Sequence, residues 1–68
     1  MPIINIKLAK PDFSKEQKEE LIADITELLH TKYNKPKQNI VIMLESIEPY
    51  DIAFGGESVE KLRSKGNK

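Results

Sequence analysis

Apolar and polar residues alternate at the start of the chain, over Pro2–Leu8. Successive side chains of a strand point to opposite faces, so Ile4, Ile6 and Leu8 would share one face while Ile3 lies on the other. The alternation predicts a first strand over these residues.

A longer segment follows the period of a helix. Its apolar residues recur at steps of one, three and four: Leu21, Ile22, Ile25, Leu28, Leu29 and Tyr33. Ser14 and Gln17 have the spacing of a capping box, in which each side chain binds the other residue's backbone N–H. Asn34 tolerates the left-handed conformation that ends helices, and Pro36 cannot continue one. We therefore predict a helix from about Lys15 to Tyr33.

The run Ile40–Leu44 is apolar at every position, which in a strand indicates burial on both faces. A strand, a helix and a second strand predict a right-handed β-α-β unit with parallel strands. One helix covers only one face of two strands. The other face, which includes Ile3, needs a second copy of the chain, so we expect an obligate homo-oligomer.

The remaining chain predicts less regular structure. Residues 46–51 have the composition of a turn, and residues 52–57 that of a short hairpin or extended arm. Ile52 and Phe54 in this arm have few neighbours to cover them, so we expect the arm to pack on another subunit. The tail at residues 64–68 is expected to fray, and the whole chain, 1–68, forms one α+β domain.

Composition narrows the function further. The chain has 68 residues, no cysteine, one histidine, and 11 basic residues balanced by 11 acidic ones. We expect no disulfide, no metal site and no cofactor, and the lack of a basic stripe with aromatics argues against a nucleic-acid partner. No apolar run approaches the ~20 residues of a membrane span, and no signal-peptide pattern opens the chain. We expect no membrane partner and a cytoplasmic protein.

Pro2 stands directly behind the initiator methionine, at the start of the predicted strand. If Met1 is removed, Pro2 exposes a secondary amine. An α-amino group has an ordinary pKa of about 7.7 to 8.0, and desolvation favours its uncharged form. Such an amine is a candidate proton carrier. Alternatively, Pro2 merely starts an edge strand, where a missing N–H costs nothing.

Several features together resemble the 4-oxalocrotonate tautomerase (2-hydroxymuconate tautomerase) family. They are Met-Pro followed by Ile-Ile-Asn-Ile, the Glu-Gln-Lys opening of the helix at residues 16–18, the apolar second strand and the Gly-Gly-Glu turn at residues 55–57. The resemblance implies a β-α-β protomer, dimers that join their strands into a four-stranded sheet, and a hexamer built as a trimer of dimers. It also implies that Pro2 is the general base and acid of a keto-enol tautomerase.

The sequence departs from this family at three positions. Members with the best-known activity carry two arginines and an aromatic residue where this chain has Phe13, Val41 and Ile52. Valine cannot bind a carboxylate as an arginine does. We expect these three residues to line the substrate site and Lys10 to supply a positive charge. Further candidates are weaker: Lys37 four residues before the second strand's valine, Tyr50 and Phe54 as aromatic walls, Arg63 across a subunit boundary, and His30 as a surface residue.

We therefore predict a cofactor-independent isomerase that interconverts the enol and keto forms of a small unsaturated keto acid. One alternative keeps Pro2 but performs hydration, dehalogenation or decarboxylation. Another is a non-catalytic oligomeric scaffold or small-ligand binding protein. Retention of Met1 would favour the scaffold.

Overall fold

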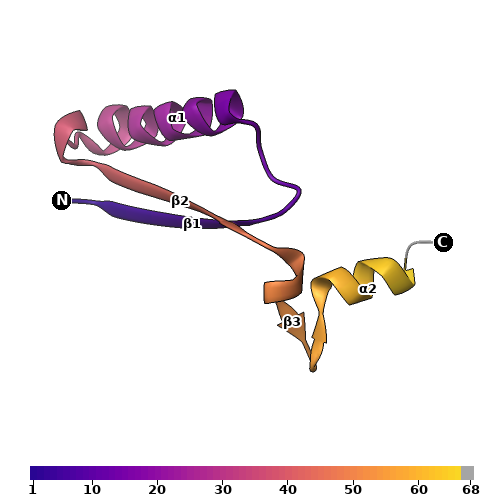
Figure 1. The fold of residues 1–68 in the computed structure, drawn as a ribbon. Helices are drawn as coiled ribbons and strands as arrows, with labels where there is room; N and C mark the ends of the chain where they lie inside the picture. The colour runs from indigo at the N-terminus through magenta and orange to yellow at the C-terminus, as the bar shows by residue number, and fades with distance from the viewer. Residues whose placement is uncertain (67–68) are drawn as a thin grey trace.

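The computed structural model describes residues 1–66, whose elements follow a β-α-β order with a C-terminal arm. The elements are β1 (Ile3–Ala9), α1 (Lys15–Tyr33), η1 (Lys37–Asn39), β2 (Val41–Ile47), η2 (Pro49–Asp51), β3 (Ala53–Phe54), β4 (Glu57–Ser58) and α2 (Val59–Gly66). Figure 1 shows β1 and β2 side by side with α1 along them, and the arm reaching away from the far end of β2. The predicted α+β class and β-α-β protomer are confirmed.

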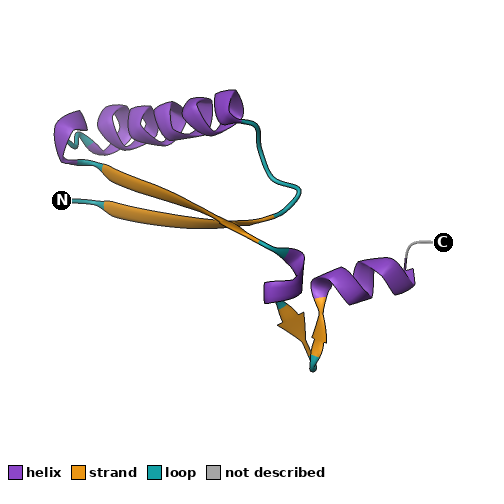
Figure 2. Ribbon diagram, in the orientation of Figure 1, coloured by secondary structure: helices purple, strands orange, loops and turns teal. Residues whose placement is uncertain are grey.

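The strands β1 and β2 run parallel, as predicted. Their register pairs Ile4 with Ile42 and Ile6 with Leu44, and these four residues are half-buried. Figure 2 shows α1 along one side of the strand pair, and the shared register and burial of these four residues place them on that side. The alternation along β1 therefore sets which apolar residues meet the helix.

The bounds of α1 match the prediction because the expected caps form at both of its ends. The Gln17 N–H donates to Ser14 Oγ at 3.2 Å, and the Ser14 N–H donates to Gln17 Oε1 at 2.9 Å. Asn34 adopts the left-handed conformation with φ 57° at the other end. The helix thus begins at Lys15 and ends at Tyr33.

The second strand is longer than predicted. It continues through Ser46 and Ile47, which pair with Leu8 and Ala9, so the turn expected from residue 46 begins only at η2. The Ser46 hydroxyl donates to the Asp12 carboxylate and accepts from Lys18 Nζ at 2.9 Å. A polar residue extends the strand here because its side chain is paired on the helix side.

The C-terminal arm contains a helix that the sequence pattern did not predict. After the expected hairpin of β3 and β4, Ser58 Oγ accepts from the Lys61 N–H at 3.1 Å and opens α2. Residues 64–66, part of the tail expected to fray, belong to this helix, which continues through Gly66. The rest of the expected tail, residues 67–68, lies outside the described residues.

The isolated chain has no buried core among its described side chains. The sheet face opposite α1 carries Ile3, Val41 and Met43, and the exposed fractions of Ile3 and Met43 are 63% and 46%. The Cα trace is elongated, 46 × 24 × 16 Å. Within residues 1–66, no helix has both the length and the apolar character needed to cross a membrane.

Candidate functional site

Pro2 and Val41 lie together at one end of the sheet. Pro2 is half-buried directly before β1, and its carbonyl accepts a hydrogen bond from the Val41 N–H at 2.9 Å. Val41 is the first residue of β2 and pairs with Ile3. The parallel register therefore fixes the backbone of Pro2 beside an apolar side chain, and brings together two of the sequence-predicted site residues.

Lys10 and Phe13 lie at the opposite end of the same strand. The Lys10 N–H donates to the Ile47 carbonyl at 2.9 Å, just past the end of β1. Eight residue steps of about 3.3 Å separate it from Pro2 by about 26 Å. Figure 1 shows the N-terminus at one end of the strand pair and the loop before α1 at the other. One chain alone therefore brings Val41 to Pro2 but leaves Lys10 and Phe13 at the far end of the strand.

The charge of Lys10 is already paired within the chain. Its ammonium lies 2.8 Å from Glu48 Oε2, and this hydrogen bond, followed by the charge of Glu48, raises the pKa of Lys10. Lys10 therefore stays protonated, but its charge is compensated by a neighbouring carboxylate. This weakens its expected role as the positive group that meets an anionic substrate.

Ile52 connects η2 to β3 in the arm and is half-buried, and its carbonyl accepts from the Val59 N–H at 2.6 Å. The two aromatic side chains around it point into solvent: Tyr50 is 60% exposed and Phe54 is 68% exposed. The arm thus presents apolar surface that its own chain leaves uncovered.

Arg63 of α2 reaches back to the loop before α1. Its Nη1 donates to the Lys10 carbonyl at 2.6 Å, across 53 residues of sequence. The sequence pattern does not predict α2, so it gives no reason to expect Arg63 at this loop. The available signal was Ser58, a helix-capping residue three positions before Lys61.

Two other candidates are engaged elsewhere. Lys37 lies in η1 rather than in an extended strand, and its ammonium is 3.1 Å from Glu27 Oε1. His30 is half-buried, and its Nδ1 donates to the Lys35 carbonyl at 2.8 Å. Its ring helps to hold the end of α1.

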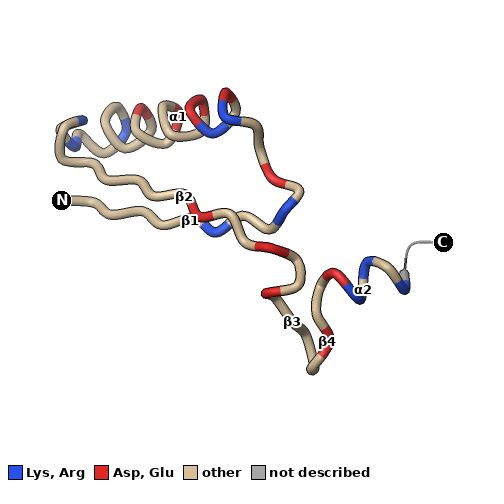
Figure 3. Tube along the Cα trace, viewed as in Figure 1, with Lys and Arg blue, Asp and Glu red and all other residues tan. Residues whose placement is uncertain are grey.

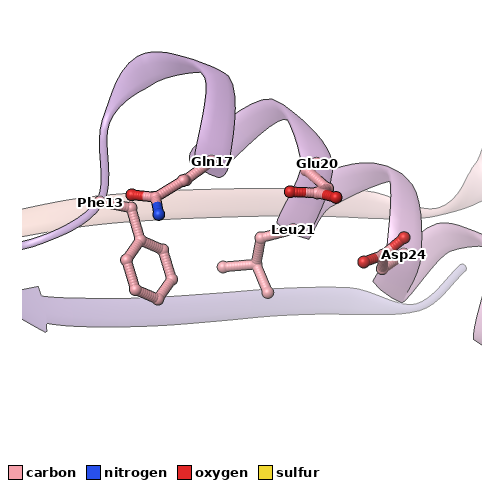
Figure 4. Close-up of a pocket in the computed structure, with 5 residues that line it drawn as sticks. All are labelled: Phe13, Gln17, Glu20, Leu21 and Asp24. Atoms are coloured by element: carbon pink, nitrogen blue, oxygen red, sulfur yellow. The ribbon is translucent and has the colours of Figure 1, made fainter.

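Phe13 is 43% exposed and lines a shallow pocket on α1. Figure 4 shows its ring beside Leu21 and Gln17, with the carboxylates of Glu20 and Asp24 further along the helix. Two carboxylates repel an anionic ligand, so this pocket is a poor site for a keto acid. No three metal-ligating side chains gather among residues 1–66.

Charged side chains are unevenly distributed over the sheet. Figure 3 shows an uncharged stretch at the starts of β1 and β2, where Pro2 lies, and charges near the ends of both strands. At that far end, Lys7 Nζ pairs with Glu45 Oε1 at 3.0 Å. Within the chain, Pro2 therefore lies beside two apolar residues, Ile3 and Val41.

Comparisons with known proteins agree with this architecture. Residues 2–62 match the family model described as tautomerase enzyme. The chain is 68% identical to probable tautomerase Cj0270 of Campylobacter jejuni over 68 residues, which cover all of both chains. It is 37% identical to DmpI of Helicobacter pylori, whose crystal structure superposes with a TM-score of 0.77 and covers 93% of this chain and 97% of that one.

A second solved structure, a heterohexameric 4-oxalocrotonate tautomerase from Chloroflexus aurantiacus, shares the fold. It is 24% identical with a TM-score of 0.76, covering 93% of this chain and all of that one. The family match favours the enzymatic alternatives over the scaffold. The chain therefore belongs to the tautomerase family, as a relative of 4-oxalocrotonate tautomerase, and is an isomerase.

Proposed function

We propose that this tautomerase interconverts the enol and keto forms of a small unsaturated keto acid, with Pro2 as the proton carrier after Met1 is removed. The observation that carries the proposal is the position of Pro2. It is half-buried at the start of β1 and fixed by the Val41 N–H at 2.9 Å. A base held in one orientation beside apolar side chains suits proton transfer.

The reaction needs only one base that later acts as an acid. The uncharged Pro2 nitrogen takes the proton of the enol hydroxyl, and the O–H electrons form the C=O bond. The electrons of the C=C bond then take the proton from the Pro2 ammonium at carbon, which restores the free amine. We propose no cofactor, since every proton and electron is supplied by the substrate and Pro2.

We further propose that the active enzyme is a homo-oligomer. Lys10 lies about 26 Å from Pro2 along β1, and Phe13 follows Lys10 in the loop before α1, so their meeting with Pro2 requires another copy. Ile3 and Met43 on the open sheet face also need a cover. Strands joined across a dimer, and three dimers in a hexamer, remain the prediction from the family resemblance.

The substrate that suits this site carries one carboxylate rather than two. Phe13, Val41 and Ile52 stand where members with the best-known activity carry arginines and an aromatic residue. Each missing charged hydrogen-bond donor weakens binding of an anion by roughly 1.5 to 3 kcal/mol. A monocarboxylate enol with an apolar substituent, such as phenylenolpyruvate, fits an apolar wall better than a dicarboxylate does.

The proposal is tested by ketonisation of phenylenolpyruvate with Pro2→Ala, after intact mass confirms removal of Met1. Pro2→Ala should fold and assemble normally but lose about 10²- to 10⁴-fold in kcat/KM. Pro36→Ala, which changes an exposed proline before η1, is the matched control and should retain full activity. As the pH increases, the kcat/KM of the native enzyme should rise with an apparent pKa below the ordinary α-amino value of about 7.7 to 8.0.

Retention of Met1 gives a second, independent arm. A Met1-retaining sample has an amide at the Pro2 nitrogen, which cannot accept the proton, so turnover should be abolished. Full activity in a Met1-retaining, assembled sample would show that Pro2 has only a structural role.

A further inference from the structure

The connection between α1 and β2, residues 34–40, ends at the group that holds Pro2. Val41 directly follows the connection, and its N–H donates to the Pro2 carbonyl at 2.9 Å. The last turn of the connection, η1, is closed by the Ile40 N–H, which donates to the Lys37 carbonyl at 3.1 Å. The path of this connection therefore determines where the Val41 N–H meets Pro2.

Two polar side chains of α1 tie the connection to the helix within residues 1–66. Glu27 Oε1 lies 3.1 Å from Lys37 Nζ, but both side chains are more than half exposed, and water weakens such an ion pair. The other is His30, half-buried on the last turn of α1, whose Nδ1 lies 2.8 Å from the Lys35 carbonyl. The His30 bond is therefore the stronger of the two ties.

The His30 bond has a fixed direction. A carbonyl oxygen only accepts, so Nδ1 carries the hydrogen and donates it to Lys35. The Lys35 N–H donates in turn to the Leu29 carbonyl at 3.2 Å. Lys35 is thus held to α1 through both of its backbone polar groups, and His30 supplies the side-chain half of that attachment.

Loss of this bond would leave the Lys35 carbonyl to water and the connection to its exposed ion pair. The connection would then move more freely against α1, and Val41 would move with it. Because the Val41 N–H holds the Pro2 carbonyl, the Pro2 amine would lose its fixed orientation. A misplacement of about 1 Å, even one caused far from the chemistry, costs up to about 10²-fold in rate.

We propose that His30 is a positioning residue of this tautomerase. By holding the Lys35 carbonyl it fixes the α1–β2 connection, and with it the Val41 N–H that orients Pro2. The inference rests on the proposed function, because it takes Pro2 to be the proton carrier. His30 acts through the backbone and exchanges no proton with the substrate.

Two substitutions of similar shape isolate the donor. His30→Asn keeps an N–H in place of Nδ1, since its amide nitrogen lies the same number of bonds from the backbone, whereas His30→Leu fills the space without a donor. In ketonisation of phenylenolpyruvate, His30→Leu should lower kcat about 10- to 100-fold with little change in KM. His30→Asn should keep most of the native kcat. Thr31→Ala removes a hydroxyl that bonds the Glu27 carbonyl inside the same helix, and should behave like native enzyme.

The pH profile separates positioning from a general loss of stability. In His30→Leu the apparent pKa of kcat/KM should rise toward the ordinary α-amino value of about 7.7 to 8.0, because a loosened Pro2 amine is better hydrated. A merely structural role would lower the melting temperature and leave this pKa unchanged. His30→Asn should keep the native profile, which also excludes the imidazole as the group that titrates.

Amide hydrogen exchange measures the same coupling without turnover. In the assembled enzyme, the Val41 N–H should exchange about 10-fold faster in His30→Leu than in native enzyme or His30→Asn, while amides in the middle of β2 keep their native rates. Sedimentation shows whether each variant assembles. If His30→Leu does not, His30→Ala takes its place with the same expectations.

Equal kcat and pH profile in His30→Leu and His30→Asn, or a native exchange rate of the Val41 N–H in His30→Leu, would overturn the inference. If native enzyme does not ketonise phenylenolpyruvate, or Pro2→Ala keeps full activity, the proposed reaction fails. Exchange of the Val41 N–H then decides by itself whether His30 positions Pro2.

Discussion

Met43→Lys tests whether the open sheet face is an interface. Met43 pairs with Asn5 on the face opposite α1, next to Ile3 and Val41, and it is 46% exposed in the isolated chain. If the chain worked as a monomer, a lysine here would meet only solvent and would cost little. If another copy covers the face, the same lysine brings a charge into an apolar contact.

The expected magnitude follows from the exposed fraction. Full burial of a methionine side chain stabilises by about 1.5 to 3 kcal/mol, so burial of the remaining 46% contributes roughly 0.7 to 1.4 kcal/mol per copy. Met43→Lys removes this stabilisation from the contact. An unpaired buried charge adds about 3 to 5 kcal/mol, less whatever the lysine recovers by extending its ammonium to water. A net loss of about 3 kcal/mol weakens each contact roughly 100-fold.

Sedimentation velocity and thermal melting over a hundredfold dilution series measure this effect. Native enzyme should sediment above 7.8 kDa and melt at lower temperature on dilution, whereas Met43→Lys should dissociate at micromolar concentration. Ala23→Lys adds the same charge on the exposed side of α1 and should assemble normally. A Met43→Lys variant that assembles and melts like Ala23→Lys, or a folded native monomer, would refute the reasoning.

Three further substitutions test the local structure. Ser14→Ala removes the acceptor of the Gln17 N–H and should cost about 1 kcal/mol, seen as a lower melting temperature than for Ser64→Ala at equal concentration. The pKa of Asp12 is lowered mainly by the Ser46 hydroxyl, so its stabilisation is present above pH 3.8 and is lost as the pH falls through the folded value. The urea concentration at half-unfolding, measured against pH, should therefore fall less steeply at low pH in Asp12→Asn than in the native protein. An equally steep fall in both proteins would contradict this. Gly55 has φ +59° and no atom within 4 Å of an added Cβ, so Gly55→Ala should lower the melting temperature through about 1 kcal/mol of backbone cost while Gly55→Asn is tolerated.

Sequence features that act on nearby residues predicted the bounds of α1 and the faces of β1 well. Ser14 and Gln17 start α1, and Asn34 ends it, because each acts on backbone groups within one turn. The apolar alternation of β1 predicted which side chains face the helix. Ser46 was missed as a strand residue because its partners, Asp12 and Lys18, lie 34 and 28 residues away in the sequence.

The candidate site was predicted in part. The position of Pro2 behind Met1 and the family resemblance predicted Pro2 and Val41 as site residues, and the two lie side by side in the structure. Neither could reveal that Glu48 compensates Lys10, or that Arg63 reaches the same loop over 53 residues. Both contacts depend on how the C-terminal arm folds back onto the loop before α1. The sequence pattern of a helix as short as α2 does not determine that path.

The length of β1 also has a genetic consequence. With Pro2 at one end of the strand and Lys10 and Phe13 beyond the other, each proposed site combines parts of two copies of the chain. In an equal mixture of two chains, one without its proline and one with a damaged loop before α1, about a quarter of the sites would receive both intact parts. After gene duplication, one copy of the gene could therefore lose the proline and still supply the loop to active sites whose proline comes from the other copy.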